Sequence, residues 1–373
     1  FIGVVAVPVT GNAGQGPGHD YATGSVIVFT AALSVWAGLT ITAALHPPDP
    51  TLRRRVLIAG FSAGVVTLVY GALLLVLLAG GDLTTTAYGR LGLAAGAALL
   101  AALAADLAAL RAARKSARPV ALPTELVALA VLGAVSAMAV STAPRLLATK
   151  PEIWDVLLGY RLPGAPTVLR FLTFWRFDTF LGVIAVALAG GYVLGLLRLN
   201  RRGDRWPAGR TVAWLAGCTA LVFATGSGVR SYGSAMFSVH MVEHMTLNMF
   251  VPVLLVLGAP VTLALRVLPS SPAGSPPGPR EWIVRLVHSP LTAFLSNPIT
   301  AFVLFIGSLY AVYFTPLFDT LVRYHWGHEF MAVHFLITGY LFYWGIIGVD
   351  PGPRRLPFIG RLALLFAIMP FHA

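Results

Sequence analysis

Charged residues and cysteines are both scarce in this chain. Asp, Glu, Lys and Arg make up 11% of its 373 residues, whereas a soluble domain carries roughly 25%. The single cysteine, Cys218, excludes an internal disulfide and any metal or redox centre that needs two thiolates of this chain. The shortage of charge excludes a soluble globular protein.

Apolar residues take the place of the missing charge. Hydrophobic residues account for 57% of the chain, and the mean hydropathy is +0.80. They come in blocks of about 20 residues, the helix length that crosses ~30 Å of hydrocarbon. We therefore predict an all-α polytopic transmembrane helix bundle with about nine complete spans and a partial helix at each end. The predicted complete spans are 25–45, 56–80, 90–110, 124–143, 178–199, 209–229, 236–258, 297–316 and 327–349, and the partial ones are 1–10 and 361–373.

Both ends of the sequence lie inside apolar runs. It opens without Met on Phe1–Thr10 and closes on Pro370–Ala373. We therefore expect a fragment of a longer protein, truncated within a helix at both ends.

Lys and Arg residues gather in alternate loops between the predicted spans. Because loops rich in Lys and Arg stay on the cytoplasmic side, this bias predicts a multi-pass protein of the bacterial plasma membrane with these loops inside. The net charge of +12 is then a topological signal, and we expect no nucleic-acid partner. Most of the 26 basic residues lie near 53–55, 111–118, 198–210, 266–285 and 354–361.

A long polar loop at 145–177 separates two groups of spans. We predict a four-helix membrane domain at 1–144, an outer loop or linker at 145–177, and a second membrane domain at 178–373. Within the second domain we predict a flexible linker at Ser270–Pro279. We also predict a helix at 281–296 that lies in the inner membrane interface.

Histidines gather in the second predicted domain, toward its outer face. His240 and His244 are four residues apart and share one face of a helix. His328 and His334 lie on another predicted span, and His372 reaches a similar depth on the last partial helix. Because an unpartnered polar group in lipid costs several kcal/mol, we predict that these histidines bind a metal or a cofactor. Interhelical hydrogen bonding is the structural alternative.

The donor types narrow the choice of metal. Met241 and Met245 form a thioether stripe beside the two histidines of their helix. Imidazole together with thioether favours copper, above all Cu(I). Three histidines also suit zinc. Glu243 and Glu329 are the acidic residues near the cluster, too few for magnesium, calcium or manganese.

The segment from His240 to His244 also fits the H-x-x-E-H pattern of inverted zinc proteases. Glu243 would then be the general base that activates a zinc-bound water. Three fixed positions in a histidine-rich chain are a weak match, and no distal glutamate ligand stands out in the sequence. A membrane metalloprotease is the least favoured alternative.

Six short stretches of the second half combine histidine, proline and glycine at characteristic places. They are Phe237–Met245 (FSVHMVEHM), Leu255–Pro260 (LVLGAP), Tyr313–Asp319 (YFTPLFD), Gly327–His334 (GHEFMAVH), Asp350–Pro353 (DPGP) and Met369–His372 (MPFH). With them, the chain from about residue 150 onward resembles the CtaG-type cytochrome c oxidase assembly factors, seven-helix membrane proteins associated with copper delivery to the oxidase. The resemblance implies that the residues of interest are His240, His244, His328, His334 and His372.

The first half carries a different set of short motifs. They are Val35–Leu39 (VWAGL), Thr85–Arg90 (TTAYGR), Glu125–Leu126 and Ser141–Pro144 (STAP). With them, this half resembles the copper resistance D (CopD) domain, which is implicated in copper movement across the inner membrane. That family often places a histidine about seven residues before the tryptophan, and Phe29 stands there instead. We expect His19 to be a solvated loop residue.

These patterns predict a membrane protein without enzymatic activity that captures Cu(I) at the outer face. We expect it to support copper delivery to a haem–copper cytochrome c oxidase, with oxidase subunits and the lipid bilayer as partners. Two other functions stay open. One is a haem-binding electron-transfer protein that uses His244 and His334 as axial ligands, and the other is a copper permease.

Overall fold

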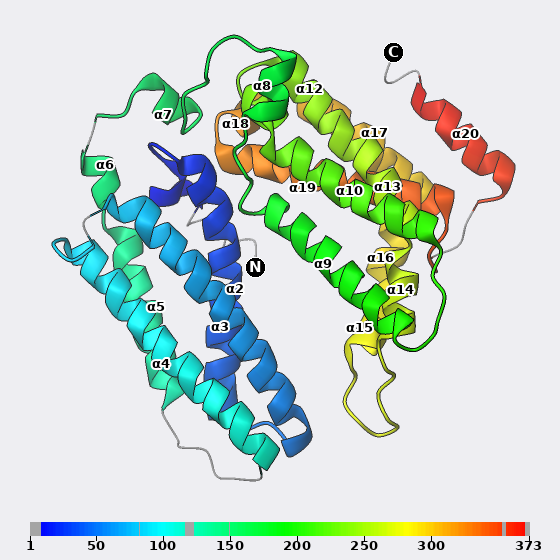
Figure 1. Ribbon diagram of the computed structural model, residues 1–373. Coiled ribbons are helices and arrows are strands. Elements are labelled where there is room, and N and C mark those ends of the chain that lie inside the picture. The colour runs from blue at the N-terminus through cyan, green and yellow to red at the C-terminus, as the bar shows by residue number, and fades with distance from the viewer. Residues whose placement is uncertain (1–8, 82, 116–122, 149, 353–355, 370–373) are drawn as a thin grey trace. The chain divides into compact units, whose positions relative to one another are not determined.

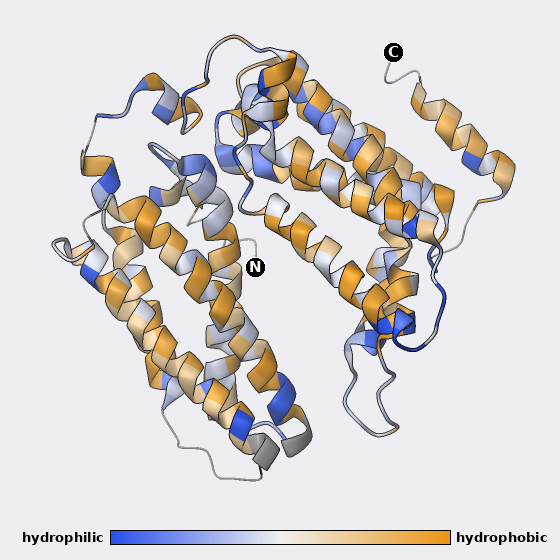
Figure 2. Cartoon of the chain, viewed as in Figure 1, coloured by the Kyte–Doolittle hydropathy of each residue, from blue (hydrophilic) through white to orange (hydrophobic). Residues whose placement is uncertain are grey.

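The computed structural model describes residues 9–81, 83–115, 123–148, 150–352 and 356–369. Every regular element among them is helical, and eight of the helices are long and apolar enough to cross a membrane. Figure 2 shows apolar residues along the bodies of these helices and hydrophilic ones gathered near their ends and in the loops. The predicted all-α polytopic membrane bundle is confirmed.

The chain forms two compact units, Phe1–Arg161 and Leu162–Ala373. Their boundary falls inside the loop 145–177, where the polar composition indicated a linker. The identity of each predicted domain stays a prediction.

The first unit is built on four long antiparallel helices (Figure 1). Trp36 is completely buried at its centre and packs with Leu33, Leu103 and Val131. Gly64 lets a neighbouring helix approach this ring, because a Cβ there would lie 2.9 Å from Trp36 Cδ1. The long helices are α2 (His19–Leu45), α3 (Pro50–Ala79), α4 (Ala87–Lys115) and α5 (Thr124–Val140), and the short elements are η1 (Asn12–Gly14), α6 (Pro144–Ala148) and α7 (Ile153–Leu157).

His19 is buried, so the expectation of a solvated loop residue is wrong. It is the first residue of α2 and is 3% exposed. Its Nδ1 lies 3.0 Å from the carbonyl oxygen of Gly16 and 3.2 Å from that of Asp155. Both of these contacts are to backbone groups, as expected of a ring that fixes the start of a helix.

The second unit packs longer helices against short ones. Its core includes the fully buried side chains of Leu221, Val251 and Phe305. The helices are α8 (Val168–Thr173), α9 (Leu181–Asn200), α10 (Ala208–Gly226), α11 (Gly228–Gly233), α12 (Phe237–Met245), η2 (Thr246–Phe250), α13 (Val251–Leu257), α14 (Pro260–Val267), α15 (Pro279–Val287), α16 (Pro290–Leu295), α17 (Pro298–Tyr313), α18 (Leu317–Val322), α19 (His325–Ile347) and α20 (Phe358–Ile368).

Helix α12 is the first part of an irregular span, Phe237–Val267. The turn η2 is a π-helix that precedes Pro252. Proline has no N–H to donate and its ring clashes with the carbonyl of residue i−4, here Asn248, so a widened turn relieves the clash. A second break lies at Ala259, whose φ is +50°. Despite these two breaks, the span continues to Val267, past residue 258, where the predicted span ended.

Helix α14 is capped by a residue that lies far away in the sequence. Asp350 Oδ2 accepts a hydrogen bond from the N–H of Val261 at 3.0 Å, and its Oδ1 accepts one from Thr262 at 2.7 Å. These bonds satisfy backbone donors that a helix start leaves free, and the carboxylate favours the positive end of the helix dipole. The first residue of the DPGP motif thus lies beside the two residues that directly follow LVLGAP.

Two of the predicted helices differ from the structure in their bounds. Helix α17 has 16 residues, about 24 Å, and ends at Tyr313 before Thr315 and Pro316, so it is shorter than the predicted complete span. The predicted interfacial helix at 281–296 is two helices, α15 and α16, because Pro290 starts a new one. Of the partial helices at the two ends, residues 1–8 and 370–373 lie outside the described part of the chain.

Candidate metal centre

Three histidines come together inside the second unit. His240 and His244 lie one turn apart on α12, and His328 lies in the first turn of α19. One ring nitrogen of each falls within 4.8 Å of the others. The Nε2 atoms of His244 and His328 are 3.0 Å apart. All three side chains are buried, with at most 3% exposed.

Several imidazole nitrogens of this tri-histidine cluster have no partner among the described residues. Both Nδ1 and Nε2 of His240 are buried without a hydrogen bond, and so is Nδ1 of His244. An unsatisfied buried polar atom costs about 1–3 kcal/mol. Because a neutral imidazole nitrogen is a good ligand for borderline and soft metals, a bound cation would remove this cost.

Aromatic side chains cover one side of the cluster. The His240 ring lies 5.3 Å from the ring of Phe318 and 6.0 Å from that of Tyr313, measured between centroids. The ring of His244 meets Phe335 edge to face at 5.1 Å. This cover lowers the local dielectric, which strengthens electrostatic interactions at the site.

Buried ionic groups adjoin the cluster. The Arg230 guanidinium on α11 donates to Glu243 Oε1 at 3.0 Å and to Glu329 Oε1 at 2.8 Å. Glu243 Oε2 lies 3.4 Å from His328 Nε2, and His325 Nε2 lies 3.2 Å from Glu329 Oε1. Glu243 precedes His244 on α12, and Glu329 follows His328 on α19. Because Arg230 binds both glutamates, it holds these two helices in register at the site.

A third carboxyl group, that of Asp178, adjoins this ionic network. Its Oδ1 caps the start of α9 by accepting hydrogen bonds from the N–H groups of Phe180 and Leu181, at 2.7 and 2.9 Å. Burial and the negative charge of Glu329 raise the pKa of Asp178 to about 8, against the opposing effect of Arg230. The Arg230 guanidinium thus binds two carboxyl groups and acts electrostatically on a third.

Glycine makes the approach of α11 to α12 possible. A Cβ at Gly233 would lie 2.8 Å from Glu243 Oε2 and 3.4 Å from the Cα of His240. The hydrogen of glycine leaves room for the carboxylate beside the histidines.

The remaining predicted ligands are one further histidine on α19, two methionines on α12, and His372. His334 is not part of the cluster; its ring packs between Phe330 and Phe335. Met245 is half-buried and packs against the cluster of Leu309, Met331 and Phe335, while Met241 is half-buried on α12. His372 lies outside the described residues. The haem alternative needs His244 and His334 as its two axial ligands. Among the described residues, His244 lies against His328 instead, and His334 is not part of the cluster.

Sequence reasoning missed the ionic half of the site. Arg230, Asp178 and His325 received no role in the sequence analysis. A signal was present, because Glu243 and Glu329 both stand in apolar segments and a buried carboxylate needs a cation. Arg230, in a stretch rich in glycine and serine on the same predicted side, was available to supply it. The ion pair to Arg230 favours a structural role for Glu243 over that of a general base.

Comparison with known proteins places a family match over this site. Residues 190–373 match the model of the family described as cytochrome c oxidase caa3 assembly factor (Caa3_CtaG). The matched region contains the tri-histidine cluster and Arg230, whereas Asp178 precedes it. The match does not reach the first half, so the CopD resemblance stays a prediction.

The chain also has relatives among curated mycobacterial proteins. It is 59% identical over its whole length to an uncharacterized protein of Mycobacterium leprae (strain TN). It is 58% identical, again over its whole length, to uncharacterized proteins of Mycobacterium bovis and Mycobacterium tuberculosis. The chain spans 56% of the length of each of these relatives. No solved structure matches it.

Proposed function

We propose that this protein handles copper in the bacterial plasma membrane and supports delivery of that copper to a haem–copper cytochrome c oxidase during assembly. The observation that carries the proposal is the buried tri-histidine cluster with its unpaired nitrogens. The family match over residues 190–373 supports the link to oxidase assembly. The proposed role is binding and transfer, without catalysis.

The charge around the cluster supports a cation as cargo. Two glutamates, Glu243 and Glu329, contact the single guanidinium of Arg230, so Arg230 does not pair exclusively with Glu243. In a low-dielectric interior an uncompensated charge is costly, so a positive ion beside Glu243 would lower the free energy of the loaded state. Glu243 Oε2 is buried, has no hydrogen bond among the described residues, and lies on the side of His328.

The donor set supports copper as the ion. Imidazole nitrogens suit copper and zinc alike, whereas a thioether favours Cu(I). Met241 and Met245 on α12 are proposed as exchangeable ligands on the way in or out, and His334 and His372 as further stations for the ion. Transfer to an oxidase subunit requires that the ion can leave, which a site of neutral imidazoles allows more readily than one of thiolates.

The first half is proposed to assist copper movement, on its resemblance to the CopD domain alone. Its motif tryptophan, Trp36, is wholly buried in the unit's core. Phe29, which stands where the histidine is expected, packs against Gly71. Copper movement through this half therefore needs ligands other than that histidine.

The test is Cu(I) affinity, measured on the full chain in detergent by competition with a chromophoric Cu(I) chelator. Removing two of three imidazoles with His240→Ala/His244→Ala should weaken binding by more than about 100-fold, since loss of a mere supporting group costs about 10–100-fold. His288→Ala, at the other end of the unit, is the matched control and should bind as wild type. Unchanged Cu(I) affinity in the double variant would refute the copper site.

The link to the oxidase needs a separate measurement. Cells that lack the protein should assemble less active cytochrome c oxidase, and wild-type protein should restore it while the double variant should not. Restoration by the double variant would separate oxidase assembly from the tri-histidine cluster.

A further inference from the structure

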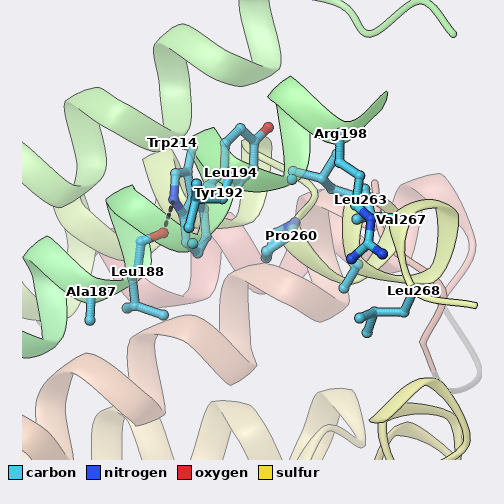
Figure 3. Close-up of a pocket in the computed structure, with 13 residues that line it drawn as sticks. Ala187, Leu188, Tyr192, Leu194, Arg198, Trp214, Pro260, Leu263, Val267 and Leu268 are labelled. Carbon is cyan, nitrogen blue, oxygen red and sulfur yellow. Dashed lines mark hydrogen bonds between the residues drawn. The ribbon is translucent and has the colours of Figure 1, made fainter. Parts of the chain in front are cut away.

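A groove runs along the membrane-spanning helix α9, away from the histidines. It has a volume of about 400 Å³ and lies between α9, α10 and α14. Figure 3 shows Trp214 and Tyr192 stacked on one side, and Leu263 and Val267 of α14 on another. The walls are held by hydrogen bonds, from Trp214 Nε1 to the carbonyl of Leu188 and from the Tyr192 hydroxyl to that of Gly258.

Small residues on α9 create the hollow. Ala187, Gly191 and Gly195 recur every four residues and line it along one face of the helix. A Cβ added at Gly191 would meet nothing within 4 Å, so this part of the groove is open space. Leu194, on the same helix, is 67% exposed and lies at the border of the groove. In a membrane span, exposed apolar groups of this kind face lipid chains.

One cation stands at the end of the groove. Arg198 lines it and is exposed, and it forms no hydrogen bond or ion pair with any residue that the structure describes. Other arginines in this region are engaged. Arg202 donates to the carbonyls of Arg266 and Val267, while Arg210 and Arg266 lie over the ring of Trp206. Figure 3 shows the Arg198 guanidinium reaching toward Leu263 and Val267.

We propose that this groove is a binding site for an anionic phospholipid of the leaflet next to the Arg-rich loop. An acyl chain fills the hollow over Gly191 and Gly195, and the phosphate pairs with Arg198. An apolar channel that ends at an unneutralised guanidinium matches a molecule with a long chain and a negative head. Arginine binds phosphate through two N–H groups at once, and a basic residue at the membrane surface attracts anionic lipid.

The test uses the full chain in detergent with dioleoyl phosphatidylglycerol added, and native mass spectrometry to count retained lipid. Gly191→Leu should fill the groove and abolish retention of one phosphatidylglycerol. Gly190→Leu is its matched control, because a Cβ there also meets nothing within 4 Å while Gly190 does not line the groove. Arg198→Gln should weaken retention about fivefold, and Arg201→Gln should leave it near wild type.

Three outcomes would overturn the lipid site. They are retention by Gly191→Leu equal to that of wild type, equal retention of dioleoyl phosphatidylcholine by wild type, and no retention of phosphatidylglycerol by wild type. Thermal unfolding of each variant in the same detergent separates loss of lipid from loss of fold. Cu(I) affinity should be unchanged in Gly191→Leu, because the groove shares no residue with the tri-histidine cluster.

Discussion

Arg230 joins three segments of the second unit through a single side chain. It lies on α11, is 5% exposed, and contacts Glu243 of α12 and Glu329 of α19. Removal of one member of a buried ion pair leaves an uncompensated charge, which costs about 3–5 kcal/mol. Arg230 therefore helps both to position the cluster histidines and to stabilise the second unit.

Arg230→Met should lower the free energy of unfolding by about 3–5 kcal/mol. Arg323→Met is the matched control, since Arg323 pairs with Asp319 while both side chains are 66% exposed, and such pairs contribute about 0–1 kcal/mol. Thermal unfolding in detergent measures both. A loss no larger for Arg230→Met than for Arg323→Met would show that the buried network does not stabilise the unit.

Asp178 makes stability depend on pH. Burial and Glu329 raise its pKa to about 8, so the folded protein holds a proton that the unfolded chain releases near pH 4. This proton contributes stability that is fully present below the pKa of Asp178 in the unfolded chain. The contribution is lost as pH rises through the pKa of Asp178 in the folded protein, at up to about 1.4 kcal/mol per pH unit.

The melting temperature of the wild type should therefore fall between pH 5.5 and 8 relative to that of Asp178→Asn, and the difference should level off above pH 8. Asparagine keeps the oxygen that caps α9 and mimics the protonated carboxyl toward Glu329. Parallel pH profiles for the two proteins would show that Asp178 is ionised in the fold.

Part of the site could be predicted from sequence, and the reason is local spacing. His240 and His244 share a face because they are four residues apart, which needs no knowledge of the rest of the fold. Their pairing with His328 depends on which helix packs beside α12, and the depth of a residue in the membrane does not decide this. The role of Arg230 was out of reach for the same reason, since its partners are 13 and 99 residues away.

At the scale of elements, close helix packing depends on a few glycines. A Cβ at Gly339 on α19 would lie 2.0 Å from the carbonyl oxygen of Asn248, in the π-helical turn η2. On the same helix, a Cβ at Gly345 would lie 3.8 Å from its nearest neighbour, an ordinary contact. The two positions therefore differ in packing while sharing a helix.

Gly339→Ala should destabilise the second unit by about 1–3 kcal/mol through overpacking. Gly345→Ala should be neutral or stabilise by up to about 1 kcal/mol, because alanine is the better helix former. Thermal unfolding of both variants measures the difference. Equal melting temperatures would mean that α19 shifts away from η2 at no cost.

The long apolar helices could be predicted from sequence because about 20 apolar residues suffice to identify a span. The breaks within them could not. Nothing in the sequence marks Ala259 for a positive φ, a conformation that costs alanine about 1–2 kcal/mol. The cap of the helix that follows comes from Asp350, which lies beyond six further helices. The length of α17 was overestimated because apolar residues continue in the sequence past its last helical residue, Tyr313.

At the scale of the molecule, the basic loops predict which end of the second unit faces the cytoplasm. Ala165 precedes α8, and its neighbour Gly164 accepts a hydrogen bond from Tyr232 near the histidines. Ser275 lies in the loop between α14 and α15 at the opposite end (Figure 1). Both residues are exposed, and the native Cys218 is buried.

In a Cys218→Ala background, a membrane-impermeant maleimide should label Ala165→Cys in intact cells. It should label Ser275→Cys only after the membrane is disrupted. Cys218→Ala alone is the unlabelled control. The reverse pattern would place the tri-histidine cluster on the cytoplasmic side and would remove the basis for copper capture from outside.

The cap that Asp350 places on α14 also sets a condition on biosynthesis. Val261 and Thr262 leave the ribosome almost 90 residues before Asp350, a delay of about 4–18 s at about 5–20 residues per second. During that time the first N–H groups of α14 must find a temporary partner in water, in lipid head groups or in the insertion machinery. The nascent chain therefore completes this cap only after α19 has been made and the chain has reached Asp350.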